Sequence, residues 1–143
     1  MAEFTIREIS EQFQLPPSTL RYYEEVGILT GVGRTAAGQR IFTDRHVNRL
    51  KTICCFKNTG MSIAQLQEFF TYEMEEPQHI DEILLLLGGQ KQSIEAQLTQ
   101  LRQDHLHVLR KLAYYGDIKK SLAGGQPLPE WKNYRGKTNF GEE

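Results

Sequence analysis

The sequence has few cysteines and no long apolar run. Its 143 residues include two cysteines, Cys54 and Cys55, and adjacent residues inside a helix lack the Cα and Cβ geometry that a disulfide requires. The longest aliphatic run, Ile83 to Leu87, is far shorter than the roughly 20 residues of a membrane-spanning helix. The first residues lack the positive segment and apolar stretch of a signal peptide. These absences predict a cytoplasmic protein without disulfides and without a membrane partner.

Residue sets that would support catalysis are also missing. The sequence contains no paired carboxylates, no nucleophile with a neighbouring base and no phosphate-cradling loop at a usable spacing. We therefore predict that the protein is not an enzyme, and we expect no cofactor and no metal.

Charge is balanced over the whole chain but not along it. Seventeen lysines and arginines stand against eighteen aspartates and glutamates, giving a formal net charge of −1, so bulk charge indicates no particular partner. Residues 34–57 differ, because they hold six basic residues and a single acid, Asp44. A basic segment in a neutral chain is typical of a local contact surface for an anionic partner. The six basic residues are Arg34, Arg40, Arg45, Arg49, Lys51 and Lys57.

Local signals near the start of the chain predict a helix-turn-helix unit. Thr5 and Glu8 form a capping-box pair ahead of apolar residues at helical spacing, which predicts a helix over 6–13. Pro17 suits the first position of a second helix and Gly27 suits the position just after its end, which places that helix at 17–26. Two short helices joined by a tight turn form a helix-turn-helix.

The next segments predict a winged form of this unit. Three glycines within residues 30–38 lie between short β-prone pieces, which indicates a hairpin, or wing. Capping residues then predict helices over 44–58 and 63–73. The expected fold class is mainly α, with a winged helix-turn-helix DNA-binding domain over residues 1–75.

A long helix is expected after Pro77. Eleven residues recur there at alternating spacings of four and three, the heptad seam of a coiled coil, and predict a homodimer because a single helix cannot bury such a stripe alone. Gly88 and Gly89 are expected to kink or split the helix. The predicted dimerisation helix spans 76–122, and residues 123–143 are expected to form a flexible, loosely packed tail. The seam residues are Ile80, Leu84, Leu87, Lys91, Ile94, Leu98, Leu101, His105, Val108, Leu112 and Tyr115.

The second predicted helix has one apolar and one polar face. Leu20 and Tyr23 fall on the face that would pack on the first helix. Ser18, Arg21 and Tyr22 fall on the other face, where arginine and hydroxyl groups can reach phosphates and base edges, as in a recognition helix. On spacing alone, a polar face that is merely solvated is an equal alternative.

These motifs resemble the MerR family of transcriptional regulators over residues 5–75. The resemblance implies a homodimer, paired through antiparallel long helices, on double-stranded DNA that carries a palindromic promoter operator. It also implies that the dimer bends and untwists the promoter, so that RNA polymerase engages both promoter elements. The matching segments are Thr5 to Ile9, Ser18 to Glu24, Gly27 to Leu29, Gly38 to Phe42 and Gly60 to Ile63, and the expected DNA contacts are Ser18, Arg21, Tyr22, Arg34 and Arg40, with Lys57 from the basic segment.

The resemblance also bears on regulation. No cysteine follows Cys55, so the cysteine-based metal and iron–sulfur sites of some family members are not expected. Cys54 falls toward the apolar face of its predicted helix, whereas Cys55 points away, one turn after Lys51, whose ammonium favours a thiolate. Cys55 resembles the single helical cysteine of the AdhR/NmlR-like branch, which answers aldehyde and nitrosative stress, and is the predicted sensor thiol.

Two alternatives stay open. Within the same family, the effector could be a small hydrophobic molecule held between the dimer helix and the DNA-binding lobe, or the regulator could have no effector. In another class, the chain could be a coiled-coil interaction module that does not bind DNA. A steep salt dependence of DNA binding separates a regulator from such a module.

Overall fold

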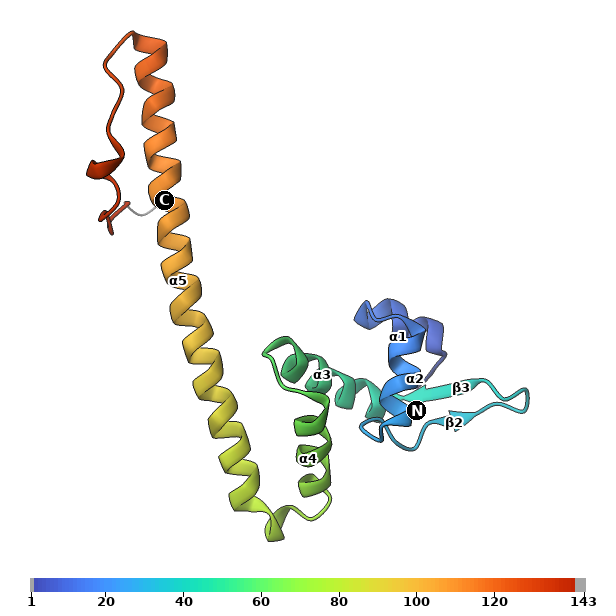
Figure 1. The fold of residues 1–143 in the computed structure, drawn as a ribbon. Helices are drawn as coiled ribbons and strands as arrows, with labels where there is room; N and C mark the ends of the chain where they lie inside the picture. The colour runs from blue at the N-terminus through green and yellow to red at the C-terminus, as the bar shows by residue number, and fades with distance from the viewer. Residues whose placement is uncertain (1, 141–143) are drawn as a thin grey trace. The chain divides into compact units, whose positions relative to one another are not determined.

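The computed structural model describes residues 2–140, which form five α-helices, three short strands and two short 3₁₀ helices (Figure 1). The chain divides into two compact units, the first ending at Lys91 and the second beginning at Gln92, and each unit is described by itself below. The mainly α, winged helix-turn-helix fold class with a long helix after it is confirmed.

The helix-turn-helix consists of α1 (Ile6–Phe13) and α2 (Pro17–Glu25). Thr5 caps α1, because its side chain accepts a hydrogen bond from the backbone of Glu8 while the Glu8 side chain accepts one from the backbone of Thr5. Gly27 follows α2 with φ +82°, a left-handed conformation that favours glycine and turns the chain out of the helix. Both helices lie where the capping signals predict them.

A three-stranded antiparallel sheet forms the wing and its base. The strands are β1 (Glu3–Phe4), β2 (Gly33–Arg34) and β3 (Arg40–Thr43), and β3 lies between the other two. Arg34 pairs directly with Arg40 across the hairpin, which confirms the predicted wing. β1 was not predicted, because two residues are too few to show a strand period.

Two further helices complete the core of the first unit. Thr43 caps α3 (Asp44–Asn58) and Ser62 caps α4 (Ile63–Glu73), as their sequence signals predict. The core gathers apolar side chains from every helix of this unit and from β3. Its fully buried members are Ile9, Leu20, Ile28, Leu29, Phe42, Leu50, Ile53, Met61 and Leu66.

The start of α5 (Ile80–Gly124) belongs to the same core. Ile83 is buried, and Leu86 and Leu87 pack against the buried cluster, so the compact unit extends past residue 75. α5 is one uninterrupted α-helix, which corrects the expected split of the helix at the two glycines. After the glycines, Gln90 Nε2 donates hydrogen bonds to the Thr59 carbonyl at 2.9 Å and to the Thr59 hydroxyl at 2.6 Å. These contacts hold the helix on both sides of the glycines and offset their poor helix propensity.

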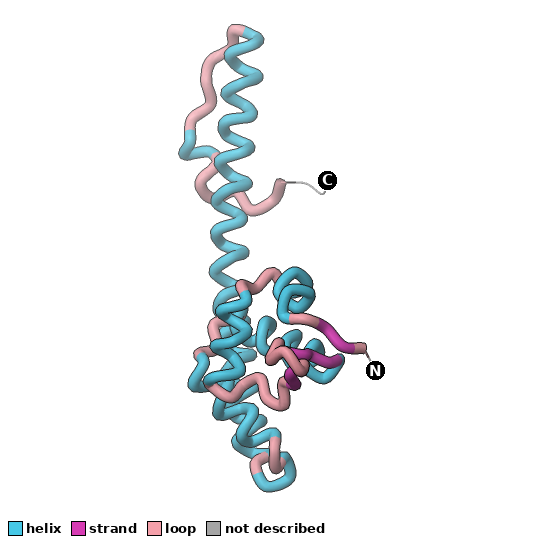
Figure 2. The backbone as a smooth tube through the Cα atoms, turned by 90° about the vertical axis from the view of Figure 1, so that its right-hand side faces the viewer, coloured by secondary structure: helices cyan, strands magenta, loops and turns pink. Residues whose placement is uncertain are grey.

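The second unit consists of the rest of α5 and the segment that follows it. Figure 2 shows this segment running back along α5. The ring of Trp131, in a 3₁₀ helix (Trp131–Asn133), lies 5.4 Å from that of Tyr114, and the Tyr134 hydroxyl donates a 2.6 Å hydrogen bond to Asp117. The Lys111 ammonium lies over the Trp131 ring. The tail is predicted to be flexible, whereas residues 131–137 contact α5 of the same chain. Its aromatic rings meet those of α5 edge-on or tilted, and aromatic rings bury much apolar area in a segment with few aliphatic residues.

The predicted heptad seam is an exposed apolar stripe in the second unit. Its leucine and valine side chains, at Leu98, Leu101, Val108 and Leu112, are between 45% and 65% exposed in the single chain. The tail does not cover them, since its ring contacts fall on His107 and Tyr114. No helix in the described part of the chain is both long and apolar enough to cross a membrane.

Candidate nucleic-acid interface

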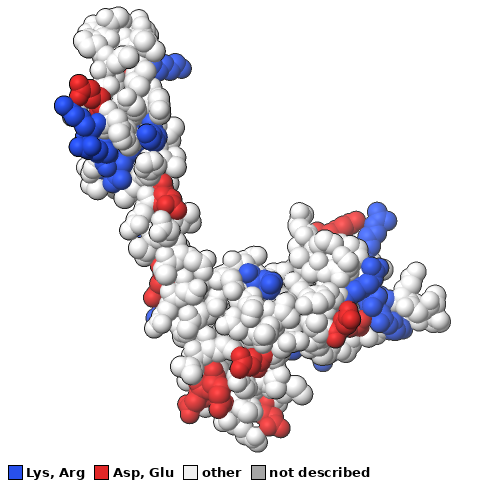
Figure 3. All heavy atoms as spheres, viewed as in Figure 1, with Lys and Arg blue, Asp and Glu red and all other residues white. Residues whose placement is uncertain are grey.

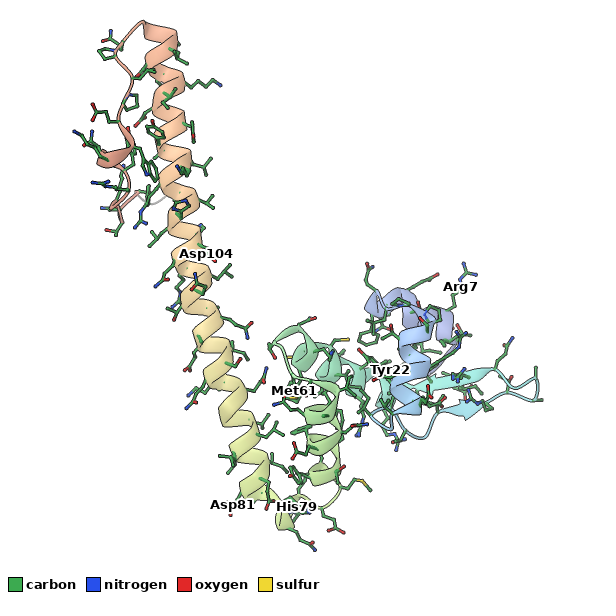
Figure 4. All side chains as sticks on the ribbon, in the orientation of Figure 1. Arg7, Tyr22, Met61, His79, Asp81 and Asp104 are labelled. Atoms are coloured by element: carbon green, nitrogen blue, oxygen red, sulfur yellow. The ribbon has the colours of Figure 1, made fainter. Side chains whose placement is uncertain are left out.

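The outward face of α2 carries the predicted recognition residues. Leu20 and Tyr23 are buried, whereas Ser18, Arg21 and Tyr22 are exposed. The predicted division of this helix into two faces is thus confirmed, although the structure does not test the role of the exposed residues. Figure 4 shows Tyr22 on α2 and Arg7 on the neighbouring α1.

An arginine-lined hollow lies where α1, α2 and the hairpin meet. Arg7, Arg21 and Arg40 come from these three elements and line a hollow of about 420 Å³, together with Thr5, Ile6, Gly38 and Gln39. A concave surface with three guanidinium groups is suited to phosphate oxygens, because guanidinium donates paired, charge-assisted hydrogen bonds to them. The structure brings together the predicted contacts Arg21 and Arg40, and it adds Arg7.

Two residues that line this hollow, Arg7 and the cap residue Thr5, were not among the candidates predicted from the sequence. A signal for both was present, since the capping box already places them at the exposed first turn of α1. That turn presents backbone N–H groups and the positive end of the helix dipole, which favour an anion. The spacing of residues along the sequence does not show that the hairpin lies beside the first turn of α1.

The two wing arginines share one acidic partner on α2. Glu24 Oε1 accepts hydrogen bonds from Arg34 Nη2 at 3.1 Å and from Arg40 Nε at 3.0 Å. The Glu24 side chain is 23% exposed, that of Arg40 24% and that of Arg34 43%. The wing is therefore tied to the helix that carries the recognition residues.

The basic segment 34–57 does not form one surface. Arg45 donates to the carbonyl of Thr30 and Arg49 donates to the carbonyl of Ile28, so both fasten α3 to the segment after α2. The Arg49 guanidinium also lies 3.7 Å from the centre of the Phe70 ring. Burial lowers the pKa of Arg49. These two arginines support the fold, which corrects the prediction of a single anion-binding segment.

The remaining bases of the segment, Lys51 and Lys57, are exposed on α3. Lys57 lies in the last turn of that helix and is not among the residues that line the arginine hollow. Figure 3 shows Lys and Arg side chains over α1, α2 and the hairpin with acidic side chains beside them, and acidic side chains where α4 leads to α5. Residues 58–90, which include α4 and the start of α5, hold six acidic residues and no Lys or Arg.

His46 holds the base of the wing against α3. It is buried, its Nδ1 accepts from the Thr43 backbone N–H at 2.9 Å, and its Nε2 lies 2.8 Å from the carbonyl of Thr30. Because Nδ1 accepts, the ring proton lies on Nε2 and is donated to Thr30. One side chain thereby satisfies the hydrogen-bonding groups of two backbone segments, the N–H at the start of α3 and the carbonyl before the hairpin.

The two cysteines differ in exposure as the helix geometry predicts. Cys55 is exposed on α3, whereas Cys54 is half-buried. Burial raises the pKa of the Cys54 thiol, which disfavours its thiolate. No group of three or more His, Cys, Asp or Glu side chains within residues 2–140 is placed to hold a metal ion.

Comparison with known proteins gives one family. The MerR HTH family regulatory protein profile matches residues 4–73. A HTH-type transcriptional regulator of Haemophilus influenzae is 33% identical over 117 residues, which span 81% of this chain and 86% of that protein. AdhR of Bacillus subtilis, also a HTH-type transcriptional regulator, is 32% identical over 62% of this chain and 64% of its own.

Solved structures agree with this family. The crystal structure of HiNmlR, a MerR family regulator lacking the sensor domain and bound to promoter DNA, superposes with a TM-score of 0.72 at 31% identity, covering 87% of this chain and 97% of that one. These relatives are transcriptional regulators, which confirms the prediction that the chain is not an enzyme, and AdhR and HiNmlR fit the predicted branch. The chain belongs to the MerR family of DNA-binding transcriptional regulators.

Proposed function

We propose that the protein binds a palindromic promoter operator as a homodimer, with α2 in the major groove and the wing on the flanking backbone. The observation that carries this proposal is the arginine hollow, where Arg7, Arg21 and Arg40 converge from three elements beside the exposed face of α2. HiNmlR, which this chain resembles over most of its length, is bound to promoter DNA. Ser18, Tyr22, Arg34 and Lys57 remain the further proposed DNA contacts. The alternative of a module without DNA binding is set aside, because the chain belongs to a family of DNA-binding regulators.

The homodimer in this proposal forms along α5. A stripe of half-exposed leucines and valine at heptad spacing has no partner within the described chain, and an antiparallel second α5 would bury it. Two DNA-binding lobes related by two-fold symmetry match a palindrome. The dimer bends and untwists the operator, so that RNA polymerase engages both promoter elements.

DNA binding is tested by selecting the tightest duplex from a randomised palindromic library and measuring its affinity at several salt concentrations. Arg21→Ala is expected to weaken binding by about 1–3 kcal/mol, or roughly 5- to 150-fold, because it removes a charged contact from the recognition face. Arg135→Ala, in the exposed part of the tail, is the matched control and is expected to bind as the wild type does. Equal affinity for selected and scrambled duplexes, or no salt dependence, contradicts the proposal.

We further propose that Cys55 is the sensor thiol for electrophiles. It is the exposed cysteine of the pair and lies one helical turn after Lys51, while burial disfavours the thiolate of Cys54. AdhR and HiNmlR, which share the names of the branch that Cys55 resembles, are among the relatives. A reporter gene under the operator is expected to lose its aldehyde response in Cys55→Ser and keep it in Cys54→Ser. A full response in Cys55→Ser contradicts this role.

A small hydrophobic effector held between the dimer helix and the DNA-binding lobe, or no effector, stays the alternative proposal. The apolar groove lined by Leu98, Leu101, His105 and Val108 lies on the predicted seam, where the second α5 of the proposed dimer would cover it. We therefore assign this groove to the dimer interface.

A further inference from the structure

Glu24 places a negative charge within the proposed DNA-binding surface, where an acid opposes phosphate. It lies on α2, two residues after Tyr22, and its Oε1 atom holds both wing arginines. Both ion pairs are partly buried, so they hold the hairpin on α2 and are only partly screened by water and salt. Because the two arginines are also proposed DNA contacts, the same carboxylate sets both their position and the charge that they offer to phosphate.

The pairing of the hairpin explains how the carboxylate acts. Arg34 and Arg40 stand directly opposite each other on β2 and β3, where two like charges repel. One carboxylate oxygen between them offsets this repulsion and fixes both guanidinium groups relative to α2. The same oxygen cancels one of the two positive charges that the wing offers to DNA.

We infer that Glu24 is a positioning residue that sets the preference of this protein for its operator over other DNA. Affinity for any DNA grows with the number of phosphates that arginines and lysines neutralise, whereas preference for one sequence requires α2 and the wing to hold a fixed geometry. Glu24 lowers the affinity for any DNA, because it neutralises charge that would otherwise meet phosphate. It raises the preference for one sequence, because it ties Arg34 and Arg40 to α2. This inference rests on the proposed mode of DNA binding.

The test compares affinities for two probes over a range of salt concentrations. One probe is the duplex that wild-type protein selects from a randomised palindromic library, and the other is a scrambled duplex of the same length and base composition. Glu24→Gln removes the charge and keeps an acceptor oxygen. The substitution frees one arginine for one more phosphate, so the slope of log affinity against log salt concentration becomes steeper by about 0.9. Binding to scrambled DNA is then up to about eightfold tighter at about 0.1 M salt. Operator affinity is expected to rise less, so the ratio of the two affinities falls.

Two further variants separate position from charge. Glu25→Gln removes the same charge from the adjacent, exposed residue of α2 and is expected to keep the wild-type ratio. The double variant Glu24→Gln/Arg34→Gln has the wild-type net charge but no tie between β2 and α2, and its ratio is expected to stay low. A wild-type ratio in Glu24→Gln or in the double variant overturns the inference, as does an equal fall in Glu25→Gln. If wild-type protein itself shows no preference, the proposed function fails as well, which distinguishes the two failures.

Discussion

The exposed stripe on α5 supports a quantitative prediction about dimerisation. Leu101 lies on the seam and is 64% exposed in the single chain. A second copy of α5 can therefore bury most of its surface. Leu85 is 80% exposed on the same helix but falls outside the seam spacing. The two leucines form a matched pair, because the same substitution can be made at both.

The expected cost of Leu101→Ala follows from its exposed fraction. Complete burial of a leucine side chain contributes about 1.5–3 kcal/mol, so burying the exposed part contributes about 1–2 kcal/mol. Two-fold symmetry removes this contribution twice, which weakens dimerisation by about 2–4 kcal/mol and raises the dimer Kd by roughly 30- to 1,000-fold. Leu85→Ala is expected to leave the dimer Kd within about threefold of the wild-type value, which corresponds to the small effect of a surface substitution.

Analytical ultracentrifugation over a dilution series measures both Kd values directly. Circular dichroism checks that each variant keeps the helix content of the wild type. A wild-type Kd in Leu101→Ala, or an equal increase in Leu85→Ala, refutes the assignment of the seam as the dimer interface. A protein that stays monomeric at every concentration refutes the homodimer itself.

Four further predictions concern the fold and the thiols. Arg49→Ala is expected to lower the free energy of unfolding by about 2 kcal/mol, measured in urea, because a hydrogen bond and a cation–π contact are lost. His46→Ala is expected to cost about 2–4 kcal/mol in the same assay, since it leaves two backbone groups unsatisfied and a cavity behind. Because burial raises the pKa of Cys54, iodoacetamide is expected to label Cys55 first and Cys54 only as pH increases further, which mass spectrometry detects; equal rates at every pH contradict this order. Trp131→Ala is expected to speed trypsin cleavage of the tail, since the contacts with α5 are lost, and an unchanged rate would show that they do not protect it.

The position of each helix was predictable because its signals are local. Caps at Thr5 and Ser62, a proline at the start of α2 and a glycine after its end act within a few residues of chain. The two faces of α2 and the greater exposure of Cys55 than of Cys54 follow from the helical period alone. The seam on α5 was predictable for the same reason.

The division of the basic segment depended on the tertiary structure. The six bases of residues 34–57 look alike in the sequence. Arg34 and Arg40 nevertheless meet an acid 10 and 16 residues away, while Arg45 and Arg49 reach carbonyls 15 and 21 residues away. No local pattern encodes such partners, because which side chains meet depends on how the helices pack around one core.

The family, the order of the helices and the stripe along α5 could be predicted, since each depends on residues close together in the chain. Three features became visible in the folded chain alone: Arg7, Arg21 and Arg40 share one hollow, α5 continues through Gly88 and Gly89, and the tail lies on α5. Propensity and capping act over one or two helical turns, whereas electrostatic pairing and packing act through space between residues far apart in the chain.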